Sequence, residues 1–285
     1  MKKLFKKTHT SLLLALSAAL FIAFGAYANS GADLNSVGLD LGANREITAG
    51  SEYDKSLAVK CTNGIFVGKD NDGVISWKGV PFAKPPVGEL RFKAPVPPDS
   101  GSKIYEAYNY SKKPILTTNG APNTEQNSED CLYLNIFTGA GGAKNKPVMV
   151  WIHGGSFVSG STSDIPYRGD TFAKEHPDII LVTVAYRLGF LGFMNLSEIP
   201  GGDKFKGSEN NGIKDQLEAL RWVKKNIAAF GGNPNNITIF GESAGAMSVS
   251  ALLSCKEAKG LFNKAIIESG TINSGAILST PESIK

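Results

Sequence analysis

Four short apolar runs, separated by segments with helical periodicity, constrain the fold of this 285-residue chain more than any other feature. They read "PVMVWIH" from Pro147, "DIILVTVAYR" from Asp178, "NITIF" from Asn236 and "KAIIES" from Lys264. The first two are near-continuous apolar runs, which are typical of strands that are buried on both faces of a sheet, and the other two are read as further strands. Because strands that alternate with helices form parallel sheets, we predict an α/β fold whose mostly parallel sheet has helices on both faces.

Two helices are predicted between and after these runs. The segment "NGIKDQLEALRWVKKNIAAF" begins at Asn211, carries apolar residues at helical spacing and is stopped by two glycines. A second helix is expected from about Ala244 to Ser254. Before the apolar runs, "LAVKCTNGIFVGKDNDGVISWKGV" (57–80) has β-rich stretches divided by Asn-Gly and Asp-Gly, which predicts an N-terminal antiparallel hairpin.

Residues 1–28 have the composition of a secretory signal peptide. Four lysines precede an uncharged apolar run from Ser11 to Gly25, and "AYA" supplies small residues before a cut after Ala28. We expect a secreted or periplasmic protein with no stable membrane span after cleavage, because the run is short; an uncleaved anchor is the alternative. Residues 29–56 are polar and glycine-rich, so we predict a flexible leader before a domain at 57–285.

Charge and composition give no reason to expect nucleic acid, a metal or another cofactor as a partner. The signal peptide carries four lysines and no acid, so its removal lowers the formal charge from +4 to zero. A neutral mature chain gives no reason to expect nucleic acid as a partner. The sequence lacks CxxC and HxxxH spacings, and we predict neither a metal nor another cofactor. The cysteines at 61, 131 and 255 allow at most one internal disulfide.

A pentapeptide with a central serine lies where the third apolar run meets the second helix. "GESAG" matches G-x-S-x-G, and its strand-to-helix context is that of a nucleophile elbow. The tight turn would strain Ser243, while Gly241 and Gly245 would let the flanking backbones pass closely. The helix N-terminus would favour an oxyanion beside the serine. The alternative is a glycine-rich turn with an incidental serine.

A second glycine-containing loop follows the first apolar run. In "WIHGGSFVSGS", a backbone without side chains could turn two N–H groups toward a substrate carbonyl. The oxyanion hole is predicted to consist of the N–H groups of Gly155, Ser156 and Ala244, with Gly154 permitting the turn. A plain strand-to-helix turn is the alternative.

Four motifs occur together in one order: "GVPFAKPPVGELRF", "EDCLYLNIF", "WIHGGSF" and the stretch from 210 to 245 that ends in "GESAG". In these motifs the chain resembles the type-B carboxylesterases, an α/β-hydrolase family that includes cholinesterases and bacterial p-nitrobenzyl-type esterases. The resemblance implies that Ser243 is the nucleophile and that Gly155, Ser156 and Ala244 are oxyanion donors. Two positions depart from the family: Ser156 replaces a common third glycine, and Gly139 replaces a usual proline.

In that family the serine is followed, far downstream, by an acid and then a histidine. Here the acids after Ser243 are Glu257, Glu268 and Glu282, all too early to match the family acid, and no histidine follows. The sequence therefore predicts that the catalytic acid and histidine are not in this chain. We expect the chain to be nearly inactive, and to be the N-terminal part of a longer esterase whose C-terminal half is absent.

Three upstream residues do not replace the missing partners. His153 belongs to the predicted oxyanion loop, and His176 is expected to be a solvated loop residue. Glu242 is next to the serine, but adjacent side chains diverge at a tight turn. We therefore expect Glu242 to tune the electrostatic field of the pocket rather than to act as the base.

The predicted activity is hydrolysis of neutral carboxylic esters, a small-molecule substrate class, through an acyl-enzyme. Residues 111–130 contain no aromatic side chain that could bind a choline-like cation as cholinesterases do. They also lack the cysteine that pairs with the position of Cys131 in secreted relatives; a Cys61–Cys131 disulfide stays open, and a free thiol is favoured for Cys255. The rival hypotheses are a non-catalytic binding or adhesion protein, which would not need "GESAG", and one chain of a two-chain enzyme.

Overall fold

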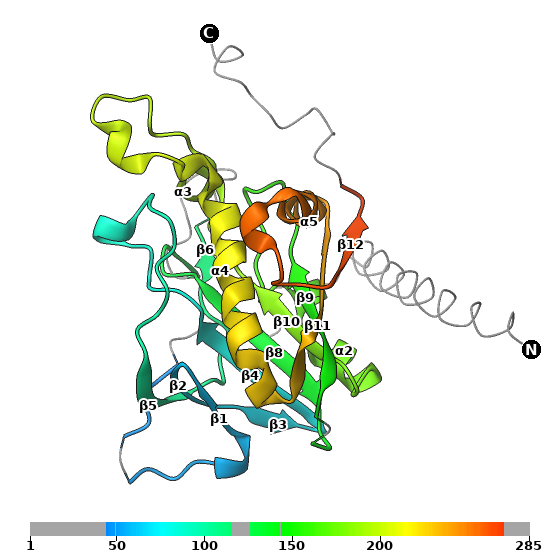
Figure 1. The fold of residues 1–285 in the computed structure, drawn as a ribbon. Helices are drawn as coiled ribbons and strands as arrows, with labels where there is room; N and C mark the ends of the chain where they lie inside the picture. Colours follow the sequence, from blue (N-terminus) through cyan, green and yellow to red (C-terminus); the bar gives the residue numbers. More distant parts are fainter. Residues whose placement is uncertain (1–43, 49, 116–125, 143, 271–285) are drawn as a thin grey trace, which may run out of the picture. The chain divides into compact units, whose positions relative to one another are not determined.

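The computed structural model of the protein describes residues 44–48, 50–115, 126–142 and 144–270. The chain divides into two compact units, residues 40–163 with 167–285, and residues 1–39 with 164–166. The second unit is described only at 164–166, so the sheets and the α-helices below belong to the first. Within the described residues the main sheet has seven strands in the order β12-β11-β9-β10-β8-β4-β3 (Figure 1).

The strands and helices follow one another along the chain as an N-terminal group of strands and then an alternation of strands and helices. The strands are β1 (Ala58–Cys61), β2 (Asn63–Val67), β3 (Lys69–Asn71), β4 (Val74–Pro81), β5 (Gly101–Glu106), β6 (Lys113–Pro114), β7 (Asn127–Ser128), β8 (Tyr133–Gly139), β9 (Lys146–Ile152), β10 (Ile180–Val184), β11 (Gly232–Glu242) and β12 (Lys264–Glu268). The helices are α2 (Asp170–Glu175), α3 (Gly189–Phe193), α4 (Asn211–Asn226) and α5 (Ala244–Ser254), with 3-10 turns η1 (Lys55–Leu57), η2 (Gly88–Leu90), η3 (Ile165–Tyr167), η4 (Gly202–Phe205), η5 (Ser208–Asn210), η6 (Ile227–Phe230) and η7 (Lys256–Ala258).

The central strands of the main sheet are the predicted apolar runs. β10 pairs with β9, β9 with β11 and β11 with β12, all in parallel. β8, β4 and β3 extend the same sheet by antiparallel pairing, so the sheet as a whole is mixed. Every residue of β10 is buried, as its continuous apolar sequence requires. The predicted α/β class is confirmed, and β1 and β2 form the predicted N-terminal antiparallel pair.

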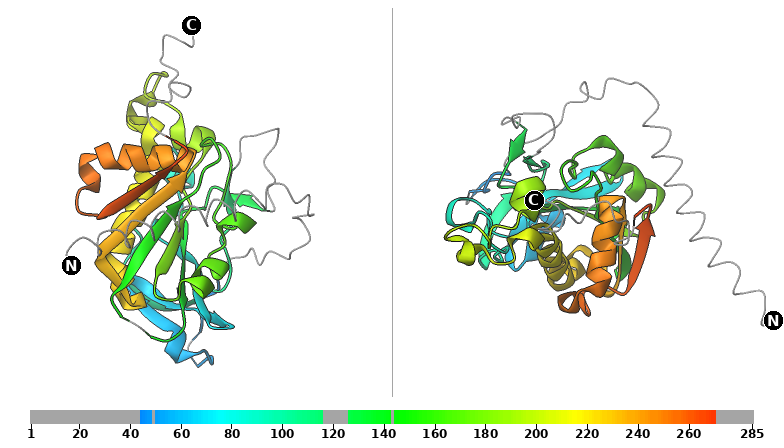
Figure 2. Two further views of the ribbon diagram at one scale, coloured as in Figure 1. Left: turned by 90° about the vertical axis from the view of Figure 1, so that its right-hand side faces the viewer. Right: turned by 90° about the horizontal axis from the view of Figure 1, so that it is seen from above.

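Helices cover both faces of the main sheet. α4 and α5 lie together on one face, and α2 lies on the other (Figure 2). β9 lies between β10 and β11 in the sheet. The chain runs from β9 to its neighbour β10 and then crosses back over β9 to β11 on the other side. The strand order therefore reverses at β9, and the loops that leave β9 and β11 go to opposite faces. Ligands of open α/β sheets bind in the crevice at such a reversal, at the carboxyl ends of the strands.

Part of the predicted leader is held by backbone and amide hydrogen bonds. The N–H of Ile47 donates to the carbonyl of Ile104 in β5, and Glu46 forms a bridge with Tyr105. The Asn44 amide donates to the carbonyl of Lys78 and accepts from the N–H of Tyr108. Residues 44–48 thus form part of the fold, while the predicted signal peptide and residues 29–43 lie outside the described residues. No helix in the described ranges is long and apolar enough to cross a bilayer.

All three cysteines carry free thiols in the structure. Cys61 and Cys131 are buried, and Cys255 is half-buried near the end of α5. The Cys61–Cys131 disulfide that the sequence left open is therefore not formed. Burial raises the pKa of the Cys61 thiol to about 12, and burial also raises the pKa of Cys131. Both thiols are protonated at neutral pH, so they pack as small apolar side chains.

Candidate active site

Ser243 occupies the turn between β11 and α5 with a strained backbone. Its φ of 54° and ψ of −119° lie in a region that residues with a side chain rarely adopt. The Ser243 N–H donates to the carbonyl of Glu268 in β12 over 2.9 Å, and its carbonyl accepts from the N–H of Met247 over 2.9 Å. The strained turn is thus fixed on both sides, by the neighbouring strand and by the first turn of α5.

Two glycines let the Ser243 turn lie against the end of β9. A Cβ atom on Gly245 would lie 2.0 Å from the carbonyl oxygen of Ile152, and one on Gly241 would lie 2.6 Å from the Gly245 carbonyl carbon. Neither position can hold a larger residue without moving backbone. The close contact places the serine at the carboxyl end of the sheet, directly beside the loop that leaves β9.

The loop after β9 contacts the Ser243 turn. A Cβ atom on Gly154 would lie 2.7 Å from the carbonyl oxygen of Glu242 and 3.3 Å from the Cβ of Ser243. Glycine at 154 is therefore required by the close approach of the two segments. The structure brings the two predicted halves of the site together, although 88 positions of sequence separate Gly155 from Ser243.

Each predicted oxyanion donor belongs to a peptide group whose carbonyl is held by a hydrogen bond. The Gly154 carbonyl, in the same peptide as the Gly155 N–H, lies 2.9 Å from Nδ1 of His153. The Gly155 carbonyl, in the same peptide as the Ser156 N–H, accepts from the N–H groups of Val158 and Ser159, both over 3.0 Å. The Ser159 hydroxyl donates to it as well. Because peptide groups are planar, fixing the carbonyl also fixes the direction of the N–H.

The same loop stores backbone strain. Gly155 has a φ of 106°, and Ser156 and Phe157 have φ values of 55° and 61°. Left-handed conformations at residues with a side chain cost on the order of 1–3 kcal/mol each. Glycine would adopt the positive φ of Ser156 without this cost. Phe157 is held in place by packing against Phe193 of α3, with ring centroids 4.8 Å apart.

The two histidines in the described ranges, His153 and His176, pack against neighbouring aromatic side chains. His153 is fully buried, its ring stacks on Tyr186 with centroids 4.4 Å apart, and the Tyr186 hydroxyl donates to the His153 carbonyl over 2.7 Å. These contacts support the oxyanion loop. His176 ends α2, where its N–H donates to the carbonyl of Phe172 and its ring lies 4.9 Å from the Phe172 ring. It is half-buried at a helix end rather than a solvated loop residue.

Two carboxylates flank Ser243. Glu242 and Glu268 are register partners in the parallel strands β11 and β12, and Oε2 of Glu242 lies 3.1 Å from the position of a Cβ on Gly154. Burial raises the pKa of Glu242. Burial, and then the charge of Glu242, raise the pKa of Glu268. The side chain of Glu257 accepts a hydrogen bond from Cys255 in the segment after α5, and Glu282 lies outside the described residues.

Sequence reasoning missed a buried ion pair that links α4 to this region. Asp215 accepts hydrogen bonds from Nε and Nη2 of Arg187 over 2.8 and 2.7 Å, and from the Arg187 N–H over 3.0 Å. Nη1 of Arg187 donates to the carbonyl of Lys93. Two residues later, the N–H of Gly189 donates to the carbonyl of Phe157 in the oxyanion loop. The sequence offered one signal for this pair, because Asp215 lies among the apolar positions of the predicted helix. The identity of its partner, Arg187, could not be predicted from the sequence.

The arrangement of the described groups fits nucleophilic chemistry at a carbonyl carbon. Within the described ranges, no group of three or more His, Cys, Asp or Glu side chains is placed to hold a metal ion. The carboxyl ends of β9 and β11 instead present a strained serine and peptide N–H groups of fixed direction. Such groups can attack a carbonyl carbon and stabilise the oxyanion that results.

Comparison with known proteins places most of the chain in one family. The model of the carboxylesterase family matches residues 55–284, which contain every strand and helix described above.

Relatives and solved structures agree with that match. Para-nitrobenzyl esterase of Bacillus subtilis is 48% identical over 207 residues, which cover 71% of this chain and 41% of that protein. Cholinesterase of Mus musculus is 44% identical over 220 residues, covering 73% of this chain and 35% of that protein. A crystal structure of a carboxylesterase from Geobacillus stearothermophilus superposes with a TM-score of 0.69 at 49% identity, covering 75% of this chain and 43% of the other. The chain thus spans less than half the length of these proteins.

Proposed function

Because the chain belongs to the carboxylesterase family, we propose that it is the nucleophile-bearing part of a serine hydrolase that cleaves carboxylic esters. The observation that carries the proposal is the meeting of Ser243 with the loop after β9, in which carbonyl hydrogen bonds fix the N–H groups of Gly155 and Ser156. The strained backbone of the serine lowers the stability of the fold, and the carbonyl hydrogen bonds restrict the loop. Acyl transfer explains both, because it requires an exposed nucleophile and preorganised N–H donors.

In the proposed mechanism, the Ser243 oxygen attacks the carbonyl carbon of the ester, and the N–H groups of Gly155, Ser156 and Ala244 stabilise the oxyanion. The general base takes the Ser243 hydroxyl proton during this attack. When the tetrahedral intermediate collapses and the carbon–oxygen bond to the alcohol breaks, the base returns that proton to the leaving alcohol. Water then hydrolyses the acyl-enzyme and releases the acid. Glu242, half-buried beside Gly154, adds negative potential that favours positive charge on a base near the serine.

The general base and its acid partner are proposed to come from outside these 285 residues. No histidine follows Ser243 in the sequence, and His153 is engaged with the oxyanion loop. Loss of the base in a catalytic triad lowers turnover on the order of 10⁶-fold, leaving a residual rate from the oxyanion hole. We therefore propose that the chain alone turns over slowly and that a histidine-bearing partner segment restores the rate.

The proposed substrates are neutral carboxylic esters, because the segment 111–130 offers no aromatic side chain to a quaternary ammonium group. The proposed site of action is outside the cytoplasm, following the predicted signal peptide at 1–28. The second candidate, a binding protein without catalysis, is less well supported, because binding alone gives no reason for the strained φ of Ser243.

Covalent labelling tests the proposal without depending on full turnover. The chain is treated with a fluorophosphonate, with and without added imidazole as a diffusible base. We expect labelling at Ser243 that imidazole accelerates, and no labelling of Ser243→Ala. Ser254→Ala, which removes an exposed hydroxyl at the end of the same helix, is the matched control and should label normally. A folded wild-type chain that does not label with imidazole, or a Ser243→Ala variant that still does, would contradict the proposal.

A further inference from the structure

We infer that Gln216 is a positioning residue for the oxyanion hole and that it acts through Ser248 on the peptide groups around Ala244. The inference rests on the proposed function, since it describes how one of the three proposed donors is held in place. Gln216 lies in α4 and Ser248 in α5, so the contact joins the two helices on the same face of the sheet.

A chain of two buried hydrogen bonds connects Gln216 to the start of α5. Nε2 of Gln216 donates to the Ser248 hydroxyl over 3.0 Å, and that hydroxyl donates to the Ala244 carbonyl over 2.9 Å. Gln216 and Ser248 are both fully buried. A serine hydroxyl has a single hydrogen, and the Ala244 carbonyl can only accept. The hydrogen therefore goes to Ala244, and Gln216 must present its N–H₂ group, which sets the direction of both bonds.

The Ala244 N–H is fixed by the two carbonyls on either side of it. The carbonyl of Ser243, in the same peptide group as the Ala244 N–H, accepts from the N–H of Met247. The carbonyl of Ala244 itself accepts from Ser248. Since the peptide groups before and after Ala244 are both held, its N–H cannot change direction without breaking one of these bonds.

The energetics of Gln216 favour a role beyond stability. Its Oε1 atom is buried and has no hydrogen-bond partner among the described residues. A buried carbonyl without a partner lowers the stability of the fold, and an apolar side chain of similar size would avoid that cost. The amide group is therefore useful chiefly for the bond that Nε2 makes. Residues that lower stability without a packing benefit are expected at functional sites.

The test compares Gln216→Met with the wild-type full chain. We expect an unfolding midpoint equal to or above that of wild type, because the methionine buries no polar atom. We also expect labelling of Ser243 by a fluorophosphonate, with imidazole present, to be slower by about tenfold, since small displacements of an oxyanion donor are costly. If Gln216 had a purely structural role, Gln216→Met would change the unfolding midpoint and the labelling rate together, or would change neither.

The matched control removes another buried amide from the same helix. Asn226 lies at the far end of α4, where its amide donates to the Trp222 carbonyl and accepts from the Thr62 N–H. Asn226→Ala should lower the unfolding midpoint yet leave the labelling rate of the folded chain unchanged. Ser248→Ala should slow labelling as Gln216→Met does, and the double variant should be no slower than either single variant, because all three changes break one chain of bonds.

A spectroscopic measurement reports on Ala244 directly. In chain labelled with ¹⁵N-alanine, the Ala244 amide peak is assigned by its loss in Ala244→Gly. It should shift in Gln216→Met and Ser248→Ala and stay in place in Asn226→Ala. The inference would be refuted if wild type is labelled while Gln216→Met shows the same labelling rate and the same Ala244 peak position. The proposed function would then remain intact. Absence of wild-type labelling would instead refute the proposed function, and the inference with it.

Discussion

Two groups of acidic side chains in this molecule have opposite surroundings. Asp215 of α4 is fully buried, and three hydrogen bonds from Arg187 satisfy it and balance its charge. Glu242 and Glu268, at the ends of β11 and β12, face one another as register partners, and within the described residues neither forms an ion pair with a basic side chain. The framework pairs its buried carboxylate with a counter-charge, whereas the candidate site places two carboxyl groups beside the nucleophile without a basic partner among the described residues, and burial raises the pKa of both. Uncompensated titratable groups in such a place are a mark of function.

The largest effect is expected from breaking the compensated pair. Asp215→Asn leaves the Arg187 guanidinium buried without a counter-charge, and we expect a loss of about 3–5 kcal/mol in the free energy of unfolding. Urea unfolding measures the loss. The double variant Asp215→Leu/Arg187→Met should recover most of it, because it leaves no charge uncompensated. A loss below about 1 kcal/mol for Asp215→Asn would mean that water reaches the pair.

A smaller, pH-dependent effect is expected from the uncompensated pair. Because burial raises the pKa of Glu242 and Glu268 above the ordinary 4.5, the folded chain binds these protons more tightly than the unfolded chain. The stability that this contributes is present below pH 4.5 and is lost as the pH rises through the raised values. The wild-type unfolding midpoint should therefore fall more than that of Glu242→Gln over this range, and more again than that of Glu242→Gln/Glu268→Gln. Parallel midpoint curves would exclude the effect.

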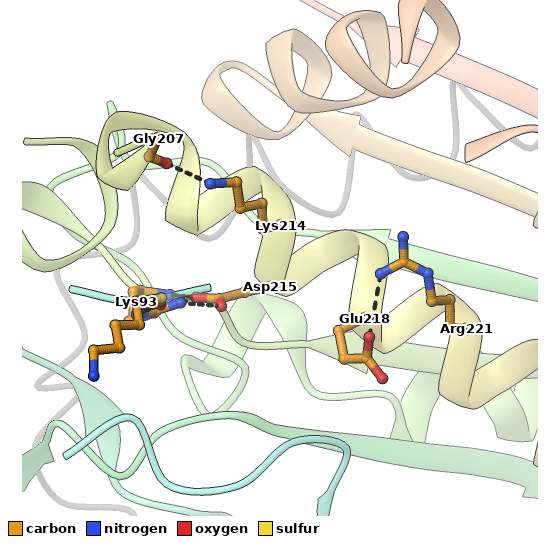
Figure 3. Close-up of polar contacts among 7 residues, drawn as sticks. Lys93, Gly207, Lys214, Asp215, Glu218 and Arg221 are labelled. Atoms are coloured by element: carbon orange, nitrogen blue, oxygen red, sulfur yellow. Dashed lines mark hydrogen bonds and ion pairs between the residues drawn. The ribbon is translucent and has the colours of Figure 1, made fainter. Parts of the chain in front are cut away.

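The smallest effect is expected from the half-exposed ion pair that Glu218 and Arg221 form on α4. Glu218 lies one turn after Asp215 and pairs with Arg221 over 3.2 Å (Figure 3). The Glu218 side chain is 9% exposed, but the Arg221 side chain is 44% exposed, so solvent reaches one end of the pair. Solvent screens such a pair, so Glu218→Gln should cost about 0.2–1 kcal/mol. Measuring unfolding at low and high salt checks the cause, since the difference should shrink as salt increases. A cost equal to that of Asp215→Asn would show that burial is not what separates the two pairs.

The sequence predicts the parts of this fold that depend on local pattern. The four apolar runs correspond to β9, β10, β11 and β12, and the predicted helix from 211 to 230 is α4 followed by a 3-10 turn. The turn at Ser243 was predictable because its glycines and flanking elements are adjacent in sequence. Its role as nucleophile stays a prediction, as do the roles of the oxyanion donors.

The contacts that hold the candidate site were not predictable, because they depend on how elements pair and pack. The bond from Gln216 to Ser248 joins residues 32 positions apart on two helices. The meeting of Glu242 with Glu268 depends on the register of β11 and β12. The stacking of His153 on Tyr186 requires that the ends of β9 and β10 lie side by side. No periodicity or spacing in a single sequence determines such pairings.

The hydrogen bond from the Ser243 N–H to the Glu268 carbonyl ties the nucleophile to β12, which is the last strand of the main sheet among the described residues. Strands at the border of a sheet fray more readily than central strands, and local opening exchanges their amide hydrogens sooner. The motion of the serine is therefore coupled to the fraying of β12. Any polypeptide that pairs with the outer side of β12 would, by slowing that fraying, also steady the residue on which the chemistry depends.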